Sequence, residues 1–112
     1  MNKRPRADWV TGLAAAIVEQ AVVDYEEALQ KLKVYSDPAS VETIMKRSRK
    51  KKDREHAENS RRAYLYHARN RIAECEMFFR GDWFAMLCDL DGELIMQSVR
   101  ERVESGTKVQ DV

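Results

Sequence analysis

The sequence predicts an all-α fold, a compact bundle of four to five helices from which a basic helix or loop projects. Strong helix formers dominate the composition, and only four glycines and two prolines interrupt them. Apolar residues also recur at steps of three and four, the spacing of one helix face. Hydrophobic residues make up 44% of the 112 positions. Residues 1–112 are therefore expected to form a single domain with a modest core.

The first helix is expected over residues 9–34, where Asp8 can cap its start. Its apolar face is the broadest in the chain and must be buried against at least two other helices. This helix is therefore expected to be the spine of the fold. The stripe consists of Trp9, Leu13, Ile17, Ala21, Tyr25, Leu29 and Leu32, widened by Val10, Val18 and Val22.

A break follows at Tyr35-Ser36-Asp37-Pro38, because the residue before a proline is pushed out of the α region. Proline suits the first turn of a new helix, which Asp37 or Ser36 would cap. The second helix is expected to bury Val41, Ile44 and Met45. Beyond Met45 its apolar pattern stops.

Residues 46–60 are polar on every face. Three alternatives are open for this segment: a projecting helix, a mobile loop, or a stretch that its partner orders. No Gly or Pro occurs between Pro38 and Gly81, so a single long helix is also open. A break near Asn59-Ser60 is favoured, because both residues are good N-caps.

The pattern returns in a third helix over about residues 60–80, whose buried stripe is Leu65, Ala68, Ile72, Cys75 and Phe79. Gly81 is expected to end it and Asp82 to start a short fourth helix. That helix presents Trp83, Phe84, Leu87 and Leu90. Asp91-Gly92 then makes a break and a cap. A fifth helix with Leu94, Ile95, Val99 and Val103 should end near Gly106, leaving residues 106–112 as a frayed tail.

Charge is distributed very unevenly along the chain. Between Lys46 and Arg71 there are eleven Lys or Arg residues and only three acidic ones. The segments before, within and after this stretch carry −2, +8 and −5, so the net charge of +1 hides a strong asymmetry. Such a basic segment attracts polyanions, neutralises an acidic partner, or is a solvated insertion.

Nucleic acid or a nucleoprotein is the favoured partner, because Lys and Arg neutralise phosphates and release counterions. Arg62, Tyr66 and Arg69 fall on one helix face, where an aromatic ring lies between two guanidinium groups. An alternative for Tyr66 is that it only covers the rim of the core. The candidate nucleic-acid-binding residues are Lys46, Arg47, Arg49, Lys50, Lys51, Lys52, Arg54, Arg61, Arg62, Tyr66 and Arg69.

The sequence contains no arrangement of residues that predicts catalysis, a metal site or a cofactor. His56, His67, Cys75 and Cys88 are the only soft ligands and lack the paired short spacing of zinc sites. Cys75 is expected to be a small core residue and His67 a partly exposed one. No nucleophile with a base at helical spacing occurs, so the protein is expected not to be an enzyme.

An acidic cluster supports a rival interpretation, a protein–protein inhibitor or adaptor that uses the C-terminal half. Aromatic residues lie close to this cluster, and together they could bind a basic protein. These aromatics could instead simply form the core around Gly81. Self-association as a homodimer is a third alternative. The cluster consists of Glu74, Glu76, Asp82, Asp89, Asp91 and Glu93, and the aromatics are Phe78, Trp83 and Phe84.

Two further features concern the compartment. No stretch approaches the roughly 20 apolar residues of a membrane-spanning helix. The two cysteines form no disulfide framework, which favours a reducing compartment. A cytoplasmic protein without a membrane partner is therefore expected.

The segment from Arg71 to Ile95 and the Trp9–Leu29 helix resemble small, mostly uncharacterised helical proteins of phages and other mobile elements of Firmicutes. Together they cover roughly half of the chain, whereas the basic middle has no counterpart in that family. The resemblance implies a small binding protein in a host bacterial cell. It also implies inhibition of a host defence such as an RNA-guided nuclease, the anti-CRISPR type of activity. It carries over no functional residues.

Overall fold

The computed structural model describes residues 8–47 and 50–106, and the side chains of 8–10, 44, 45 and 47 lie outside that description. The described chain is all-α, as predicted. Its five helices are α1 (Asp8–Ser36), α2 (Pro38–Arg47), α3 (Lys51–Arg80), α4 (Asp82–Leu87) and α5 (Gly92–Ser105). The predictions for the side chains of Trp9, Val10, Ile44 and Met45, and for the tail beyond Gly106, lie outside the described residues.

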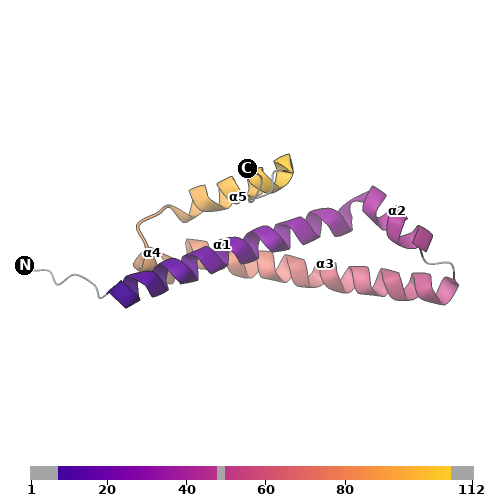
Figure 1. Ribbon diagram of the computed structural model, residues 1–112, viewed down its shortest axis with the longest axis horizontal. Helices are drawn as coiled ribbons and strands as arrows, with labels where there is room; N and C mark the ends of the chain where they lie inside the picture. The colour runs from indigo at the N-terminus through magenta and orange to yellow at the C-terminus, as the bar shows by residue number, and fades with distance from the viewer. Residues whose placement is uncertain (1–7, 48–49, 107–112) are drawn as a thin grey trace, which may run out of the picture.

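Two long antiparallel helices, α1 and α3, run the length of the molecule (Figure 1). At the rise of an α-helix each is about 44 Å long. Helix α5 lies along α1 at one end, where α4 joins it to α3, and α2 lies at the other end. The expected role of the first helix as spine is confirmed, since α1 contacts each of the other four helices.

The core occupies only one end of this arrangement. Its buried residues come from four helices, namely Tyr25, Cys75, Phe79, Phe84, Met96, Val99 and Val103. Toward α2 the molecule narrows to a hairpin of α1 and α3, closed by the buried alanines Ala28 and Ala68 and by Leu65. The radius of gyration is 18.7 Å, against about 13 Å for a compact domain of this length. The expected compactness therefore holds for one half of the molecule only.

Most of the predicted helix boundaries are confirmed. Asp37 caps α2, because its carboxylate accepts hydrogen bonds from the Ala39 amide and the Ser40 hydroxyl. Asp91 caps α5 by accepting from the Glu93 amide at 2.9 Å. Helix α5 ends at Ser105 and is followed by Gly106, whose φ of 76° is in the left-handed region that favours glycine.

The predicted break near Asn59-Ser60 is wrong, because α3 is continuous from Lys51 to Arg80. Ion pairs span the predicted break, from Glu58 to both Arg61 and Arg62. Ion pairs three and four residues apart stabilise a continuous helix. The helix therefore runs through Asn59 and Ser60, although both residues could cap a new one. Arg61 also donates to the Tyr35 carbonyl and so holds this turn of α3 against the end of α1.

Four predicted core residues are exposed instead: Leu13, Trp83, Leu90 and Leu94, at 54 to 63%. On α1 the buried residue is Ala14, one position after Leu13. On α4, Phe84 is buried while its neighbour Trp83 is exposed. On α5, Met96 is buried while Leu94, two positions earlier, is exposed. Helix α4 is short and α5 forms only a single layer. Part of the apolar surface of these helices and of α1 therefore stays uncovered.

Candidate nucleic-acid interface

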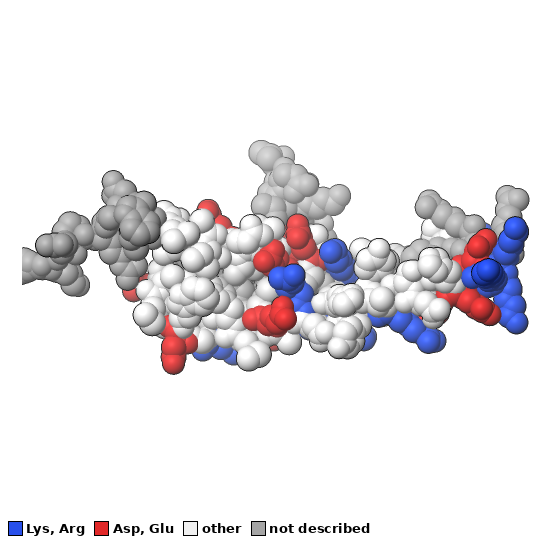
Figure 2. All heavy atoms as spheres, turned by 90° about the horizontal axis from the view of Figure 1, so that it is seen from below, with Lys and Arg blue, Asp and Glu red and all other residues white. Residues whose placement is uncertain are grey.

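The predicted basic segment forms the narrow end of the molecule. Here the basic tip means Lys46 at the end of α2 and Lys50, Lys51, Lys52 and Arg54 at the start of α3, all of which are exposed. Figure 2 shows Lys and Arg side chains gathered at this end, with Asp and Glu side chains directly beside them. Arg49 and the side chain of Arg47 lie outside the described residues. The tip is far from the core, which leaves it accessible to a large partner.

Within the tip, some lysines are paired and others are not. Lys46 Nζ lies 3.2 Å from Glu42 Oε1, an exposed pair one helix turn apart. In the described part of the chain, Lys50, Lys51 and Lys52 form no ion pair. Exposed pairs contribute little, so Lys46 can exchange Glu42 for another anion. The three consecutive lysines are the strongest cationic feature of the tip.

Arg61 is committed to the fold. Its guanidinium contacts both carboxylate oxygens of Glu58, at 2.7 and 3.0 Å, and donates to the Tyr35 carbonyl at 3.0 Å. The hydrogen bond from Arg61 holds the pKa of Glu58 below its usual value of 4.5, and the pKa of Arg61 is raised in turn. Although sequence reasoning placed Arg61 among the nucleic-acid contacts, its geometry is that of a clamp between α3 and the end of α1.

The predicted face of Arg62, Tyr66 and Arg69 is exposed along α3. Tyr66 is 63% exposed, so the alternative that it covers the rim of the core is wrong. Its ring contacts His67 edge-on, with centroids 5.5 Å apart. Arg62 is 72% exposed while it contacts Glu58 at 3.1 Å. Base stacking on Tyr66 stays a prediction.

The tip and this face do not form one continuous positive surface. Lys51, Glu55, Glu58 and Arg62 follow one another at steps of four, three and four, and therefore lie along one line of the helix. Two glutamates thus separate the cations of the tip from Arg62. The structure brings together the residues of the tip. It does not bring all eleven predicted nucleic-acid-binding residues into one surface.

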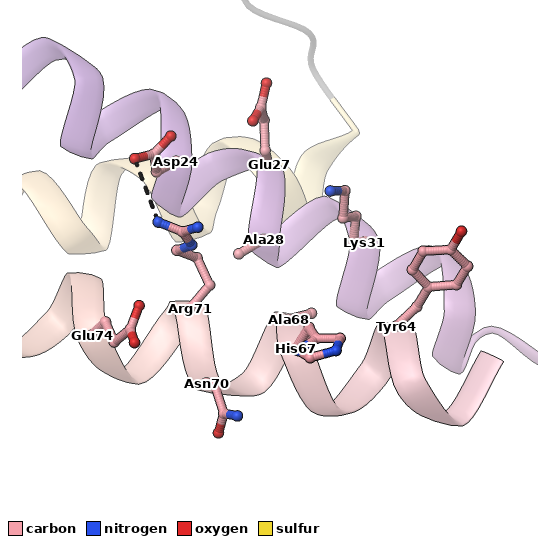
Figure 3. A pocket seen from close by; sticks show the side chains of 10 residues that line it. All are labelled: Asp24, Glu27, Ala28, Lys31, Tyr64, His67, Ala68, Asn70, Arg71 and Glu74. Carbon is pink, nitrogen blue, oxygen red and sulfur yellow. Dashed lines mark ion pairs between the residues drawn. The ribbon is translucent and has the colours of Figure 1, made fainter. Parts of the chain in front are cut away.

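A polar groove of about 430 Å³ lies between α1 and α3, on the side away from α5 (Figure 3). The buried Ala28 and Ala68 form its floor. Its charged lining residues are Asp24, Glu27, Lys31, Arg71 and Glu74, and His67, Tyr64 and Asn70 complete the walls. Arg71 Nη1 lies 3.9 Å from Asp24 Oδ2. With three carboxylates against two cations, the groove does not favour a phosphate.

Part of the predicted acidic cluster forms ion pairs and hydrogen bonds that stabilise the fold. Glu76 accepts from the buried Tyr25 hydroxyl at 2.7 Å and pairs with Arg80 and Arg100. Arg80 also contacts Glu93 at 2.7 Å, and the bond to Glu93 raises the pKa of Arg80. Glu76 therefore stabilises the packing of α1, α3 and α5.

An apolar surface lies around α4 and the start of α5; sequence reasoning included Trp83 in a candidate C-terminal surface but expected Leu90 and Leu94 in the core and did not name Met86. Trp83, Met86, Leu90 and Leu94 are each at least 59% exposed. Trp83 rests edge-on against Phe78, with centroids 6.1 Å apart. Leu90 and Leu94 also line a groove between α1 and α5. The sequence signal for this surface was the number of apolar residues, which is larger than one buried stripe on each helix can hold.

Among the described residues, no group of three or more His, Cys, Asp or Glu side chains could hold a metal ion. None of the described helices is long and apolar enough to cross a membrane. Comparison of the chain with protein-family models, curated proteins and solved structures finds no match.

Proposed function

We propose that this protein is a non-enzymatic binding protein whose basic tip contacts nucleic acid or a nucleoprotein complex. The observation that supports this best is the run of Lys50, Lys51 and Lys52, exposed at the narrow end and unpaired within the described residues. A row of unneutralised ammonium groups releases counterions when it meets a phosphate backbone. The narrow end can approach a large target without a clash from the core.

A salt series tests this proposal. Affinity for generic duplex DNA, duplex RNA and single strands is measured by fluorescence anisotropy between 50 and 200 mM salt, an interval in which phosphate-driven binding weakens strongly. The wild type should show a steep slope of log affinity against log salt. The triple change of Lys50, Lys51 and Lys52 to Gln should lower the slope for duplex DNA by about 3, near one per phosphate contact.

The matched control is Lys31→Gln, which removes an exposed lysine from the groove between α1 and α3. This variant should bind like the wild type. No binding by the wild type at low salt, or equal loss in the control and the triple variant, would contradict the proposed role of the tip.

In the cell, we propose that this contact inhibits a host defence nuclease, as the resemblance to small phage proteins implies. A bacterial strain that carries an RNA-guided nuclease and a targeted phage provides the assay. Expression of the wild type should restore phage growth, and the triple lysine variant should not. If the triple variant also restores phage growth, inhibition does not depend on the lysines of the basic tip.

A second candidate function is supported by the exposed apolar surface around α4. Trp83, Leu90 and Leu94 stand beside acidic residues and could bind a basic protein, in an inhibitor or adaptor role. The same phage assay distinguishes the two candidates. Loss of inhibition in Leu90→Glu with Leu94→Glu, combined with full inhibition by the triple lysine variant, favours the second one.

A further inference from the structure

An open groove of about 280 Å³ lies between α1 and α5 at the core end of the molecule. It is called the α5 groove below, and its apolar lining residues are Val22, Leu90, Leu94, Ile95 and Val99. Leu90 is 63% exposed and Leu94 61%. Among the described helices, α5 packs mainly against α1 and α3, so these two leucines face solvent. They are therefore accessible to an external partner.

The walls of the α5 groove are held together by contacts within the chain. Glu26 of α1 contacts Arg102 of α5 at 3.1 Å, and Lys33 of α1 donates to the Val103 carbonyl at 2.8 Å. The two helices run side by side in the same direction (Figure 1). A partner that enters a groove with fixed walls pays little to order them. Contact with the exposed leucines can therefore contribute directly to affinity.

The shape of the α5 groove suits an α-helix. Side chains of a third helix can pack into the groove between two neighbouring helices. The volume of about 280 Å³ is below the range of about 300–1,000 Å³ that is typical of small-molecule sites, so a few side chains fit better than a separate compound. The described part of the chain consists of helices and turns, which give an extended peptide no sheet edge to pair with.

Charge around the α5 groove favours a basic partner. Residues 8–30 and 81–99 contain nine Asp or Glu residues and no Lys or Arg. These two segments supply all the described lining residues except Arg102, and Asp91 is itself one of them. Arg102 is already paired with Glu26. A helix with Lys or Arg along its polar face is therefore attracted to this part of the molecule.

A second copy of this chain does not match these requirements. Two acidic grooves that face each other would repel. The basic start of α3 is not a suitable ligand either, because Ala57 is the only apolar residue between Lys51 and Arg62. The partner helix must combine large apolar residues on one face with cations on the other.

We propose that the α5 groove binds a basic amphipathic α-helix of a partner protein. Apolar side chains of that helix would pack against Val22, Leu90 and Leu94, and its Lys or Arg side chains would face the acidic surroundings. This inference rests on the second candidate function, an inhibitor or adaptor that binds a basic protein. It adds the place of the contact and the secondary structure of the ligand.

A synthetic peptide tests the proposal. The probe is a labelled peptide of about 18 residues, or five helix turns, with Leu at helical spacing and Lys at the other positions. One control peptide carries Glu in place of Lys, and a second has the composition of the probe in strictly alternating order. Binding is measured by fluorescence anisotropy without nucleic acid, and helix formation by circular dichroism of the mixture.

The wild type should bind the Leu/Lys helix about tenfold or more tightly than either control peptide, and the affinity should fall as salt rises. The peptide should gain helicity on binding. No binding at low salt, equal affinity for the Glu peptide, or binding without a gain in helicity would overturn the proposal.

The location of the peptide is tested by removing the apolar wall. Leu90→Lys with Leu94→Lys should weaken peptide binding by about 30-fold, since two apolar contacts are lost and charge is reversed. The matched control is Tyr66→Lys with Met77→Lys, which adds the same charge at two exposed residues of α3. This control should bind like the wild type, and equal loss in both variants would contradict binding in the groove.

A steric block gives a second test that leaves the charge and the leucines unchanged. Ser98 lines the groove and is exposed, and its neighbour Gln97 is exposed but is not among the described lining residues. Ser98→Tyr should fill the groove and weaken peptide binding by about tenfold, whereas Gln97→Tyr should have little effect. Equal affinity of the Ser98→Tyr variant and the wild type would place the peptide elsewhere.

The phage assay separates this inference from the function on which it rests. Peptide binding that is lost in Ser98→Tyr, together with full phage inhibition by Leu90→Glu with Leu94→Glu, supports the groove and contradicts the second candidate function. Loss of inhibition in that double variant, without peptide binding by the wild type, supports the function and overturns the proposed helix ligand.

Discussion

At Gly92 the backbone of α5 lies directly against the backbone of α3. A Cβ atom added there would lie 2.1 Å from the Phe79 carbonyl oxygen, a backbone atom that cannot move aside alone. Gly92→Ala should therefore push α5 away from the core and lower the free energy of unfolding by about 3 kcal/mol. Urea denaturation followed by circular dichroism measures the change.

Gly12 is the matched control, since nothing lies within 4 Å of an added Cβ atom in this exposed turn of α1. Gly12→Ala should raise the free energy of unfolding by about 0.5 to 1 kcal/mol, because alanine has the higher helix propensity. Equal effects of the two substitutions would contradict the proposed close approach of α5.

Tyr25 joins three helices through its hydroxyl group, which donates to Glu76 at 2.7 Å and accepts from Arg100 at 3.0 Å. Burial, followed by the bond to Glu76, raises the pKa of Tyr25 from 10.0 to about 12. In the unfolded chain Tyr25 ionises near pH 10, whereas in the folded protein it stays neutral. The stabilisation from Tyr25 is therefore complete below pH 10 and declines as pH rises toward 12.

Tyr25→Phe should remove this part of the alkaline destabilisation. Thermal melts between pH 9 and 12 should show a shallower fall in the variant than in the wild type. The variant should also be less stable at neutral pH, because Glu76 and Arg100 lose a hydrogen-bond partner. An unchanged slope above pH 10 would argue against burial of the hydroxyl.

At this scale, sequence reasoning succeeds where the local pattern decides the outcome. The caps at Asp37 and Asp91 and the buried Cys75 could be predicted because each depends on the few residues around it. Gly92 was expected only as a turn residue, since its contact is with Phe79 on another helix. Glu26, which is buried and paired with Arg102 at 3.1 Å, likewise depends on a distant partner.

Among the helices, α3 shows most clearly what the residue pattern of one helix alone does not predict. Its second half follows an apolar stripe and was predicted closely. Its first half has no such stripe, and the helix continues there through the Glu58 and Arg61 clamp onto Tyr35. Leu90 and Leu94 show the opposite outcome, because they were expected in the core and are exposed. The apolar pattern of a helix does not predict how many neighbouring helices will cover it.

The clamp gives an element-scale prediction. Arg61→Ala should release the start of α3 from α1, whereas Arg62→Ala removes only a 72% exposed contact to the same Glu58. Hydrogen exchange of the amides in residues 51–61 should become faster in Arg61→Ala and stay near wild type in Arg62→Ala. Faster exchange in both variants would mean that Glu58, rather than the bond to Tyr35, carries the stabilisation.

The same clamp should respond to acid. Because the pKa of Glu58 is lowered in the folded protein, its stabilisation is present above the usual value of 4.5 and is lost as pH falls through the lowered value. Amides of residues 51–61 should therefore lose protection as the pH falls below 4.5, before the core end responds. Glu58→Gln should remove this acid response of residues 51–61 while protection of the core end stays as in the wild type.

For the whole molecule, the core at one end predicts a gradient of stability. Amides of α3 near Cys75 and Phe79 should exchange only through global unfolding, and those near Lys51 through local opening. Native-state hydrogen exchange measures this directly. Uniform protection along α3 would contradict the gradient.

The candidate site was predictable at this scale from charge alone. An excess of eight positive charges in one segment marks the basic tip without any knowledge of the fold. How those charges are used was not predictable, because Arg61 turns inward only when Tyr35 of α1 lies beside it. The elongated shape was hidden as well, since helix lengths alone do not tell which half of a hairpin a fifth helix will cover.

The narrow hairpin end has a consequence for how the protein can evolve. The core residues and the lysines that we propose to contact nucleic acid occupy opposite ends of the same pair of helices. Substitutions at Lys50, Lys51 and Lys52 alter no buried contact, so new sequences can arise there without a folding penalty. Variation among natural relatives should accordingly concentrate at this end, while positions such as Tyr25 and Phe79 stay constant.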